Sequence, residues 1–212
     1  MQGDLFEERV EGYVIDLVRD GVLIEIQTKN FYSIRNKLRR LLKNHRVRLV
    51  HPISKERWIS RFSPEAVLIA RRRSPKSGKL IDIFEELVRI PDLINDGNFT
   101  LDVLMIKDEE VRCEDGLGSW RRKGVSIKDR ILIDVVERHE FNTRYDFLKL
   151  IPESVLPRFT NRELADSLRV PTYKIQKATY CMKKMGLINV VEKQRNAFVF
   201  ELAPGAGVPE TS

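Results

Sequence analysis

The dipeptide Asp20-Gly21 is the feature that most constrains how this chain can fold. It separates two segments, 14–18 and 22–26, in which apolar residues alternate with others. Such alternation is typical of strands, and Asp-Gly is a favoured two-residue hairpin turn because both of its positions tolerate positive φ. The sequence therefore predicts an antiparallel β-hairpin over residues 14–26.

The register of this hairpin brings two acids together. A two-residue turn places Arg19 opposite Val22, and counting back along the strands puts Asp16 directly opposite Glu25. Opposed Cβ atoms lie about 5 Å apart, and like charges at that distance destabilise a sheet. A divalent cation would offset the repulsion, and so would a Lys or Arg from elsewhere beside a solvated strand face. Spacing alone leaves both explanations open.

Strand alternation also predicts which face of the hairpin is buried. Ile15, Leu17, Ile24 and Ile26 form an unbroken apolar set, which we expect to pack against a core helix. The opposite face would carry Val14, Asp16, Val18, Leu23, Glu25 and Gln27.

A further strand, 6–10, precedes the hairpin and is joined to it by Glu11-Gly12. A turn at this dipeptide places Glu7 opposite Asp16, which makes Glu7 a third possible metal ligand. The same register turns Glu8 toward the side expected to be buried.

Beyond the hairpin the hydrophobic period changes. Apolar residues recur every three or four positions from Asn30 to Asn44, which predicts an amphipathic helix with a basic outer face. A strand is expected at 46–50, ending at His51-Pro52. The predicted order is three strands, a helix and a strand.

This order, with Asp16 on one strand and Glu25-Ile26-Gln27 on the next, resembles the core of the restriction-endonuclease-like superfamily. The signature of that superfamily is an acid followed on the next strand by acid-x-lysine, and the resemblance covers roughly the first 53 residues. It implies an α/β (α+β) fold with a mixed sheet. It also implies Mg²⁺ or Mn²⁺ held by Asp16, Glu25 and the backbone carbonyl of Ile26, and hydrolysis of phosphodiester bonds in DNA.

In that resemblance Gln27 occupies the place of the lysine that helps to position the attacking water. Lys37, on the following helix, could supply the missing ammonium or could be an ordinary solvated lysine. The superfamily's first strand usually follows a helix, for which the chain offers few residues. Three hypotheses stay open: a magnesium-dependent endonuclease, a catalytically inactive DNA-binding or regulatory protein, and a protein-interaction module. A homodimer is compatible with the resemblance.

The segment 143–202 resembles a winged helix-turn-helix. It combines a helix opening at Thr160 or Asn161, a turn at 170–172, and a helix that is capped by Thr172, runs to Met185 and stops at Gly186. That helix would carry Ile175, Ala178, Met182 and Met185 inward, and strands at 188–192 and 197–202 would follow it. The second helix would enter the major groove of DNA. Its candidate contacts are Thr172, Tyr173, Lys174, Gln176 and Lys177, with Lys193 and Arg195 on the wing. Protein contact through Tyr180 and Cys181 is the alternative.

The formal charge of +7 makes a polyanion such as DNA a plausible partner, because Lys and Arg gain affinity by displacing counterions from phosphates. The segment 71–79 would bind phosphate or form a solvated loop; its cations are Arg71, Arg72, Arg73, Lys76 and Lys79. The tetrapeptide Trp120-Arg121-Arg122-Lys123 could stack on an unpaired base or clamp a backbone.

Other features exclude function classes. The two cysteines, Cys113 and Cys181, have no zinc-ligand spacing, and no apolar run approaches the length of a membrane helix. The acidic N-terminus lacks the order of a secretory signal, so a cytoplasmic location is expected. The expected organisation is a nuclease-like α/β domain at 1–142, with its core at 1–53 and an unassigned middle at 54–142. A winged helix at 143–202 and a disordered tail at 203–212 follow.

Overall fold

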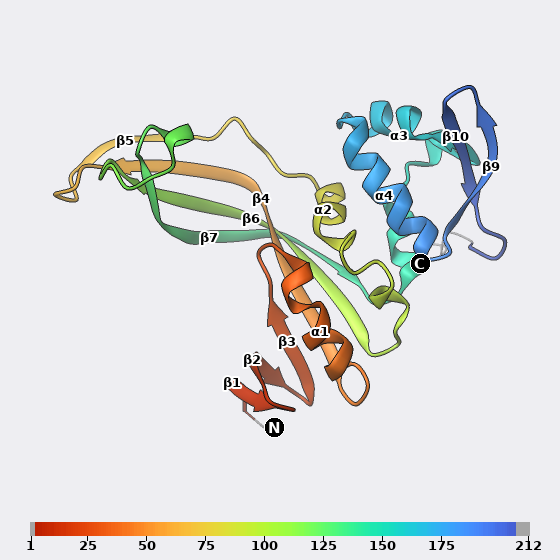
Figure 1. Cartoon of the computed structure of the whole chain (residues 1–212), viewed down its shortest axis with the longest axis horizontal. Coiled ribbons are helices and arrows are strands. Elements are labelled where there is room, and N and C mark those ends of the chain that lie inside the picture. The colour runs from red at the N-terminus through yellow and green to blue at the C-terminus, as the bar shows by residue number, and fades with distance from the viewer. Residues whose placement is uncertain (1–2, 207–212) are drawn as a thin grey trace. The chain divides into compact units, whose positions relative to one another are not determined.

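The computed structural model describes residues 3–206, as a mixed α/β protein with two compact units (Figure 1). The described part of unit 1 falls within Met1–His51, Ile81–Val103 and His139–Ser212, and unit 2 comprises Pro52–Leu80 and Leu104–Arg138. Three long strands pass from one unit into the other: β4 (Arg46–Phe62), β6 (Phe99–Cys113) and β7 (Ser126–Phe141). The units therefore divide the chain differently from the expected boundary at 142, and each is described by itself.

Unit 1 opens with the expected strand meander, β1 (Leu5–Val10), β2 (Tyr13–Arg19) and β3 (Val22–Ile26). Both turn dipeptides, Glu11-Gly12 and Asp20-Gly21, have positive φ at both positions, as such two-residue turns require. Helix α1 (Phe31–Leu41) then crosses over, so that β4 pairs parallel to β3. The strand order is β1-β2-β3-β4, with β6 beyond β4.

Helix α1 is held by its apolar face and by two distant acids. Phe31, Leu38 and Leu41 are fully buried. Glu11, in the first turn, accepts bonds from Arg40 at 2.8 Å and from Asn44 at 2.7 Å. The backbone N–H of Phe31 donates to Glu86 at 3.0 Å, which satisfies one of the free donors at the start of the helix.

The predicted buried face of the hairpin is wrong at β3. Leu23 and Glu25 are buried, whereas Ile26 is 53% exposed and Ile24 is half-buried. The reason is the parallel pairing with β4, in which Leu23 aligns with Val47 and Glu25 with Leu49. Both β4 partners are fully buried, and aligned residues of neighbouring strands share a face. Glu25 therefore lies on the buried face of β3.

Strand β4 is also longer than predicted, since it continues through His51-Pro52 to Phe62. The carbonyl of Val50 accepts from the N–H of Gln27, so the backbone groups of Val50 point toward β3. Pro52 lies two residues further along β4, so its backbone nitrogen points to the same side, beyond the end of β3. A proline is tolerated where its missing N–H has no strand to bond.

The remainder of unit 1 is mainly helical, with a small sheet of order β8-β10-β9. Helix α3 begins with the expected capping box, in which Thr160 and Glu163 bond each other's backbone N–H. The elements are η1 (Leu80–Ile83), α2 (Phe84–Leu87), η2 (Leu93–Asn95), η4 (Arg144–Leu150), η5 (Glu153–Val155), β8 (Arg158–Thr160), α3 (Asn161–Leu168), α4 (Thr172–Lys184), β9 (Ile188–Gln194) and β10 (Ala197–Leu202).

Helix α4 buries the face that its sequence predicts, which comprises Ile175, Ala178, Met182 and Met185. Two details differ. Pro171 rather than Thr172 is the N-cap residue, and Cys181 is fully buried rather than lateral. The tail was predicted to be disordered. Within it, the N–H of Ala203 donates to the carbonyl of Leu187 at 2.8 Å, and residues 207–212 lie outside the described residues.

Unit 2 is built on four strands in the order β5-β4-β6-β7, with β5 at Leu68–Arg73 and a short helical turn η3 at Trp120–Arg122. Arg71, Arg72 and Arg73 lie in strand β5 rather than in a solvated loop. Strand β6 is continuous from Phe99 to Cys113. Its acids face arginines of neighbouring strands, and Asp108, for example, accepts from Arg57 at 2.6 Å.

Candidate functional site

The β2–β3 hairpin has the register that its turn predicts. Arg19 aligns with Val22, Val18 with Leu23 and Leu17 with Ile24. The paired residues end there, and continuing the same register would place Asp16 opposite Glu25. At this position the Asp16 carboxylate accepts from the N–H of Ile26 at 2.7 Å. A side-chain oxygen thus bonds the strand at the level of the two acids.

Lys37 of α1 meets the buried acid. Its ammonium forms an ion pair with Glu25 and donates to the carbonyl of Val14 at 2.5 Å. The Lys37 side chain is only 16% exposed, and that of Glu25 only 6%. Lys37 is therefore a partner of the acid pair and not an ordinary solvated helix lysine. The Lys37 ammonium lies against the Glu25 Oε1 atom, so this oxygen already has a positive partner within the protein.

The electrostatics of Glu25 follow from this placement. Burial raises the pKa of the Glu25 carboxyl, Lys37 lowers it, and the nearby charge of Asp16 raises it again. The net result is a pKa above the ordinary value of 4.5. Additional positive charge at this position would stabilise the ionised form.

The donor set fits a divalent cation of the magnesium type. Mg²⁺ is held in proteins by one or two carboxylates together with waters or carbonyl oxygens. Asp16 is exposed, Glu25 is the second carboxylate, and the Ile26 carbonyl follows directly in the chain. No cluster of three or more His, Cys, Asp or Glu side chains suited to a metal occurs among residues 3–206. The site thus offers two carboxylates rather than a full protein cage.

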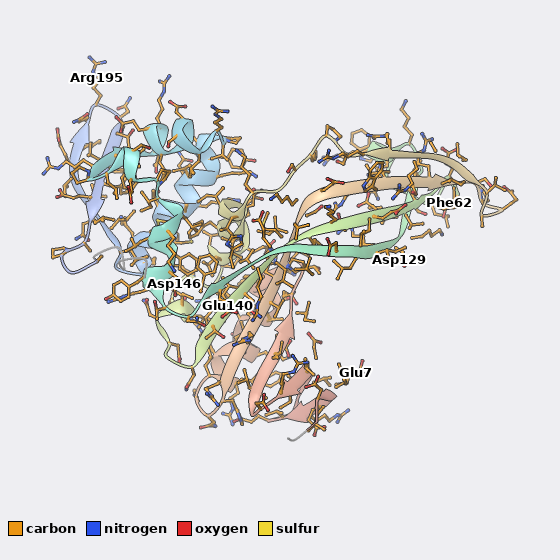
Figure 2. The ribbon with its side chains drawn as sticks, turned by 180° about the vertical axis from the view of Figure 1, so that it is seen from behind. Glu7, Phe62, Asp129, Glu140, Asp146 and Arg195 are labelled. Atoms are coloured by element: carbon orange, nitrogen blue, oxygen red, sulfur yellow. The ribbon has the colours of Figure 1, made fainter. Side chains whose placement is uncertain are left out.

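Two further predicted site residues are Gln27 and Glu7. Gln27 donates its side-chain amide to the carbonyl of Lys29 at 2.5 Å, so this amide bonds the loop before α1. Glu7 falls opposite Asp16 in the β1–β2 register, between the pairs Phe6–Leu17 and Glu8–Ile15. Its side chain is exposed on edge strand β1, where Figure 2 labels it.

Two residues that support the site were not predicted. Buried His51 donates one hydrogen bond from Nδ1 to the carbonyl of Gln27 at 2.7 Å, and its ring meets Phe31 edge-on. Burial lowers the pKa of His51, which favours the neutral ring. Glu86 caps α1 from a segment 55 positions away. Local sequence holds no signal for either contact, because both depend on long-range packing.

The predicted contacts of α4 and its wing are mostly accessible. Thr172, Tyr173 and Gln176 are exposed, Lys177 is half-buried, and Lys193 and Arg195 lie on the exposed β9–β10 hairpin. Figure 2 shows Arg195 projecting from the tip of this hairpin.

Lys174 is the exception on α4. Its ammonium bonds Asp82 at 2.6 Å and Glu85 at 3.1 Å. Burial lowers the pKa of Lys174, but these two acids outweigh it and leave the pKa raised. Lys174 therefore fastens α4 to η1 and α2, and it is not available as predicted for a DNA phosphate.

The cations of the segment 71–79 do not act as one group. Arg71 bonds Glu109 at 3.1 Å and stacks over Trp58, and Arg73 pairs with Glu56 at 2.8 Å. Arg72, which lies between them on β5, lines a pocket of unit 2. Lys76 and Lys79 are exposed in the segment after β5.

Fold and site together define a mixed α/β protein with a buried acid–lysine pair at the end of a β-meander. The chain belongs to the family described as Domain of unknown function (DUF8091), whose profile matches residues 1–142. An uncharacterized protein of Treponema pallidum (strain Nichols) is 31% identical over 144 residues. That match covers 68% of this chain and 57% of the relative.

No solved structure matches the chain. Among the described helices, none combines the length and apolar character that a bilayer-spanning segment needs.

Proposed function

We propose that this protein is a DNA-binding, metal-dependent nuclease that hydrolyses phosphodiester bonds at the Asp16–Glu25–Lys37 site. The observation that carries the proposal is the position of Lys37, whose ammonium pairs with Glu25 and donates to the carbonyl of Val14 from the helix that follows the two strands. The resemblance to restriction-endonuclease-like cores requires an ammonium beside two acids. Gln27 does not provide one, and Lys37 does.

The topology supports the same proposal. Three antiparallel strands, a crossover helix and a strand parallel to the third make up the arrangement that the resemblance implies. The two acids lie on β2 and β3, and the lysine on α1 pairs with the buried one, Glu25. A site assembled from two strands and a helix is held more rigidly than one on a loop.

Each residue has a distinct role in the proposed reaction. Asp16, Glu25 and the Ile26 carbonyl would hold Mg²⁺ or Mn²⁺, which supplies an activated water and stabilises charge on the phosphate. Lys37, whose ammonium pairs with the Glu25 carboxylate, would orient the attacking water. The Asp16 carboxylate keeps one oxygen on the Ile26 N–H, which fixes its direction.

DNA binding has its own support in the C-terminal part of unit 1. The helices α3 and α4 and the three-stranded sheet β8-β10-β9 support the proposal that this part is a winged helix-turn-helix. Thr172, Tyr173, Gln176 and Lys177 would meet the major groove, where Gln can contact adenine. Lys193 and Arg195 would meet the DNA backbone through the wing.

A second function is favoured by one observation. The Lys37–Glu25 pair neutralises the buried acid without any metal, as a structural ion pair would. In that case the protein binds DNA with a nuclease fold but does not cut it.

The test is cleavage of supercoiled, linear, single-stranded and branched DNA in Mg²⁺ or Mn²⁺. We expect wild type to cut, and Asp16→Asn, Glu25→Gln and Lys37→Ala to lose activity. Glu8→Gln and Lys43→Ala are matched controls, because both residues are exposed and lie outside the site. Binding of Mn²⁺, followed by electron paramagnetic resonance, reports on the acids independently of turnover.

Two results would contradict the nuclease assignment. One is equal cutting by wild type and all three site variants, which would place the activity elsewhere. The other is a wild type that neither cuts nor binds Mn²⁺ while it still binds DNA, which would establish the non-catalytic function.

A further inference from the structure

Unit 2 contains a strongly basic pocket that lies outside the acid–lysine site. It encloses about 600 Å³ and is lined by Arg61, Arg72, Arg112, Arg121, Arg122 and Lys123. One acid, Glu114, is among its lining residues, together with glycines of the turn before β7. The N–H of Glu114 donates to the carbonyl of Phe62, which Figure 2 labels at the end of β4. Residues 50 positions apart in sequence thus converge on one cavity.

Most of the positive charge in this pocket is not neutralised within the protein. Arg61 pairs with Glu114, and Arg112 pairs with Glu110 at 2.6 Å. Within the described part of the chain, the other four cations have no ion pair with a carboxylate; they are Arg72, Arg121, Arg122 and Lys123. This contrasts with Arg71 and Arg73 on the same strand, which both have acid partners. Four clustered cations without counter-charges favour a ligand that carries several negative charges.

The turn that forms one wall of the pocket is held in place by its own contacts. The N–H of Gly118 donates to the carbonyl of Gly124 at 2.7 Å, and Arg122 Nε donates to the carbonyl of Val125 at 3.1 Å. Asp115 bonds both Ser126 and Lys128 at 2.7 Å, and these contacts hold the pKa of its carboxyl well below the usual range. The cations are therefore presented by a braced turn.

Trp120 adds a second kind of contact beside the cations. Its side chain is 84% exposed, and the guanidinium of neighbouring Arg121 lies 5.5 Å from the ring centroid. An exposed indole beside a cationic pocket is the combination that binds unpaired bases, which stack on the ring while the phosphates meet Lys and Arg. Bases in a duplex are stacked on one another, and a continuous duplex does not enter a pocket of this size.

We infer that this pocket of unit 2 binds single-stranded nucleic acid, with phosphates at Arg72 and Arg121–Lys123 and a base on Trp120. The inference rests on the nucleic-acid-binding part of the proposed function and is independent of hydrolysis. It adds a single-strand site to the duplex contacts proposed for α4.

The test is fluorescence anisotropy of a labelled single-stranded oligonucleotide with the full chain in EDTA, so that cleavage plays no part. Arg72→Ala/Lys123→Ala should weaken binding about tenfold or more. Each phosphate contact releases counterions, and its loss removes that contribution to the affinity. Trp120→Ala should weaken it about tenfold through the lost stacking. The matched control is Lys43→Ala/Lys183→Ala, which removes two exposed lysines of unit 1 and should leave affinity unchanged.

A direct readout comes from Trp58→Phe. The sequence has two tryptophans, so this variant keeps Trp120 alone. Addition of oligonucleotide should quench its fluorescence, and Arg72→Ala/Lys123→Ala should abolish the quenching. Duplex binding in the same buffer, with Gln176→Ala/Lys177→Ala, reports separately on the α4 surface. Failure at α4 or at Asp16 would therefore leave the pocket result unaffected.

Three outcomes would overturn the inference. The first is that the wild type does not bind the single strand. The second is that the pocket variants and the control variant bind it with equal affinity. The third is that a phosphoserine peptide displaces the labelled oligonucleotide as well as the unlabelled oligonucleotide does. The third result would assign the pocket to phosphorylated protein.

Discussion

Unit 1 and unit 2 place their charges in opposite ways. In unit 1 a buried carboxylate, Glu25, is matched by Lys37, and Asp16 adds a second acid beside it. In unit 2 several sheet arginines, such as Arg57 and Arg71, are matched by acids of β6, but the pocket keeps Arg72 and Lys123 without such partners. The difference shows that a run of basic residues does not identify a binding site. The cations available to a ligand are those that no neighbouring strand neutralises.

The largest effect should separate catalysis from binding. Asp16→Asn should lower the cleavage rate on the order of a thousandfold, as expected for loss of an essential catalytic group, and leave single-strand affinity unchanged. Arg72→Ala/Lys123→Ala should show the reverse, with weaker binding and an unchanged rate at saturating DNA. Rates and dissociation constants measured for both variants check this. If both variants lower both quantities equally, the two sites are not separate.

The second effect concerns the stability of the buried pair. Lys37→Met leaves Glu25 buried without a counter-charge, and this should cost about 3 kcal/mol in urea unfolding at pH 7. Glu25→Gln/Lys37→Met should recover most of the loss, and Lys43→Met is the exposed control. A double variant as unstable as Lys37→Met would show that Lys37 acts through packing rather than charge.

The pH dependence of that loss follows from the raised pKa of Glu25. A carboxyl whose pKa is higher in the folded state favours folding below its unfolded value near 4.5, and this contribution is lost as pH rises through the folded pKa. The free energy of unfolding of Lys37→Met should therefore be closest to that of the wild type in acid and furthest from it at neutral pH. A constant difference across the range would contradict the role of Glu25.

A backbone effect should follow at the pocket wall. A Cβ at Gly118 would meet the carbonyl oxygen of Val125 at 1.9 Å, so Gly118→Ala must displace the turn. We expect a loss of about 2 kcal/mol and weaker single-strand binding, with Mn²⁺ binding in unit 1 unchanged. Gly97→Ala is the control, because nothing lies within 4 Å of its added Cβ. Normal oligonucleotide binding by Gly118→Ala would show that this wall does not shape the site.

The smallest effect is the pH dependence of metal affinity in unit 1. Because Glu25 has a raised pKa, a proton competes with the cation at a higher pH than for an ordinary carboxylate. Below that pKa, Mn²⁺ affinity should fall about tenfold per pH unit, as displacement of one proton requires. Single-strand binding in unit 2 should change little over the same range, since arginine and lysine remain charged. Parallel pH profiles at the two sites would contradict this contrast.

The sequence by itself determined the local framework of unit 1. Asp20-Gly21 set the hairpin register from Arg19–Val22 to Leu17–Ile24, and the helical period located α1. Thr160 and Glu163 marked the start of α3, and Gly186 the end of α4. These features are local, because turn geometry, capping and side-chain period depend on residues within a few positions of one another.

Only the tertiary structure decided which of these residues are buried and which charges remain free. Parallel pairing with β4 put Glu25 rather than Ile26 on the covered face, and α1 then brought Lys37 onto it. In unit 2, strand pairing neutralised Arg71 and left Arg72 in the pocket with Lys123. Burial and charge compensation depend on residues far apart in the chain, and alternation within one strand cannot specify what the next strand or helix will cover.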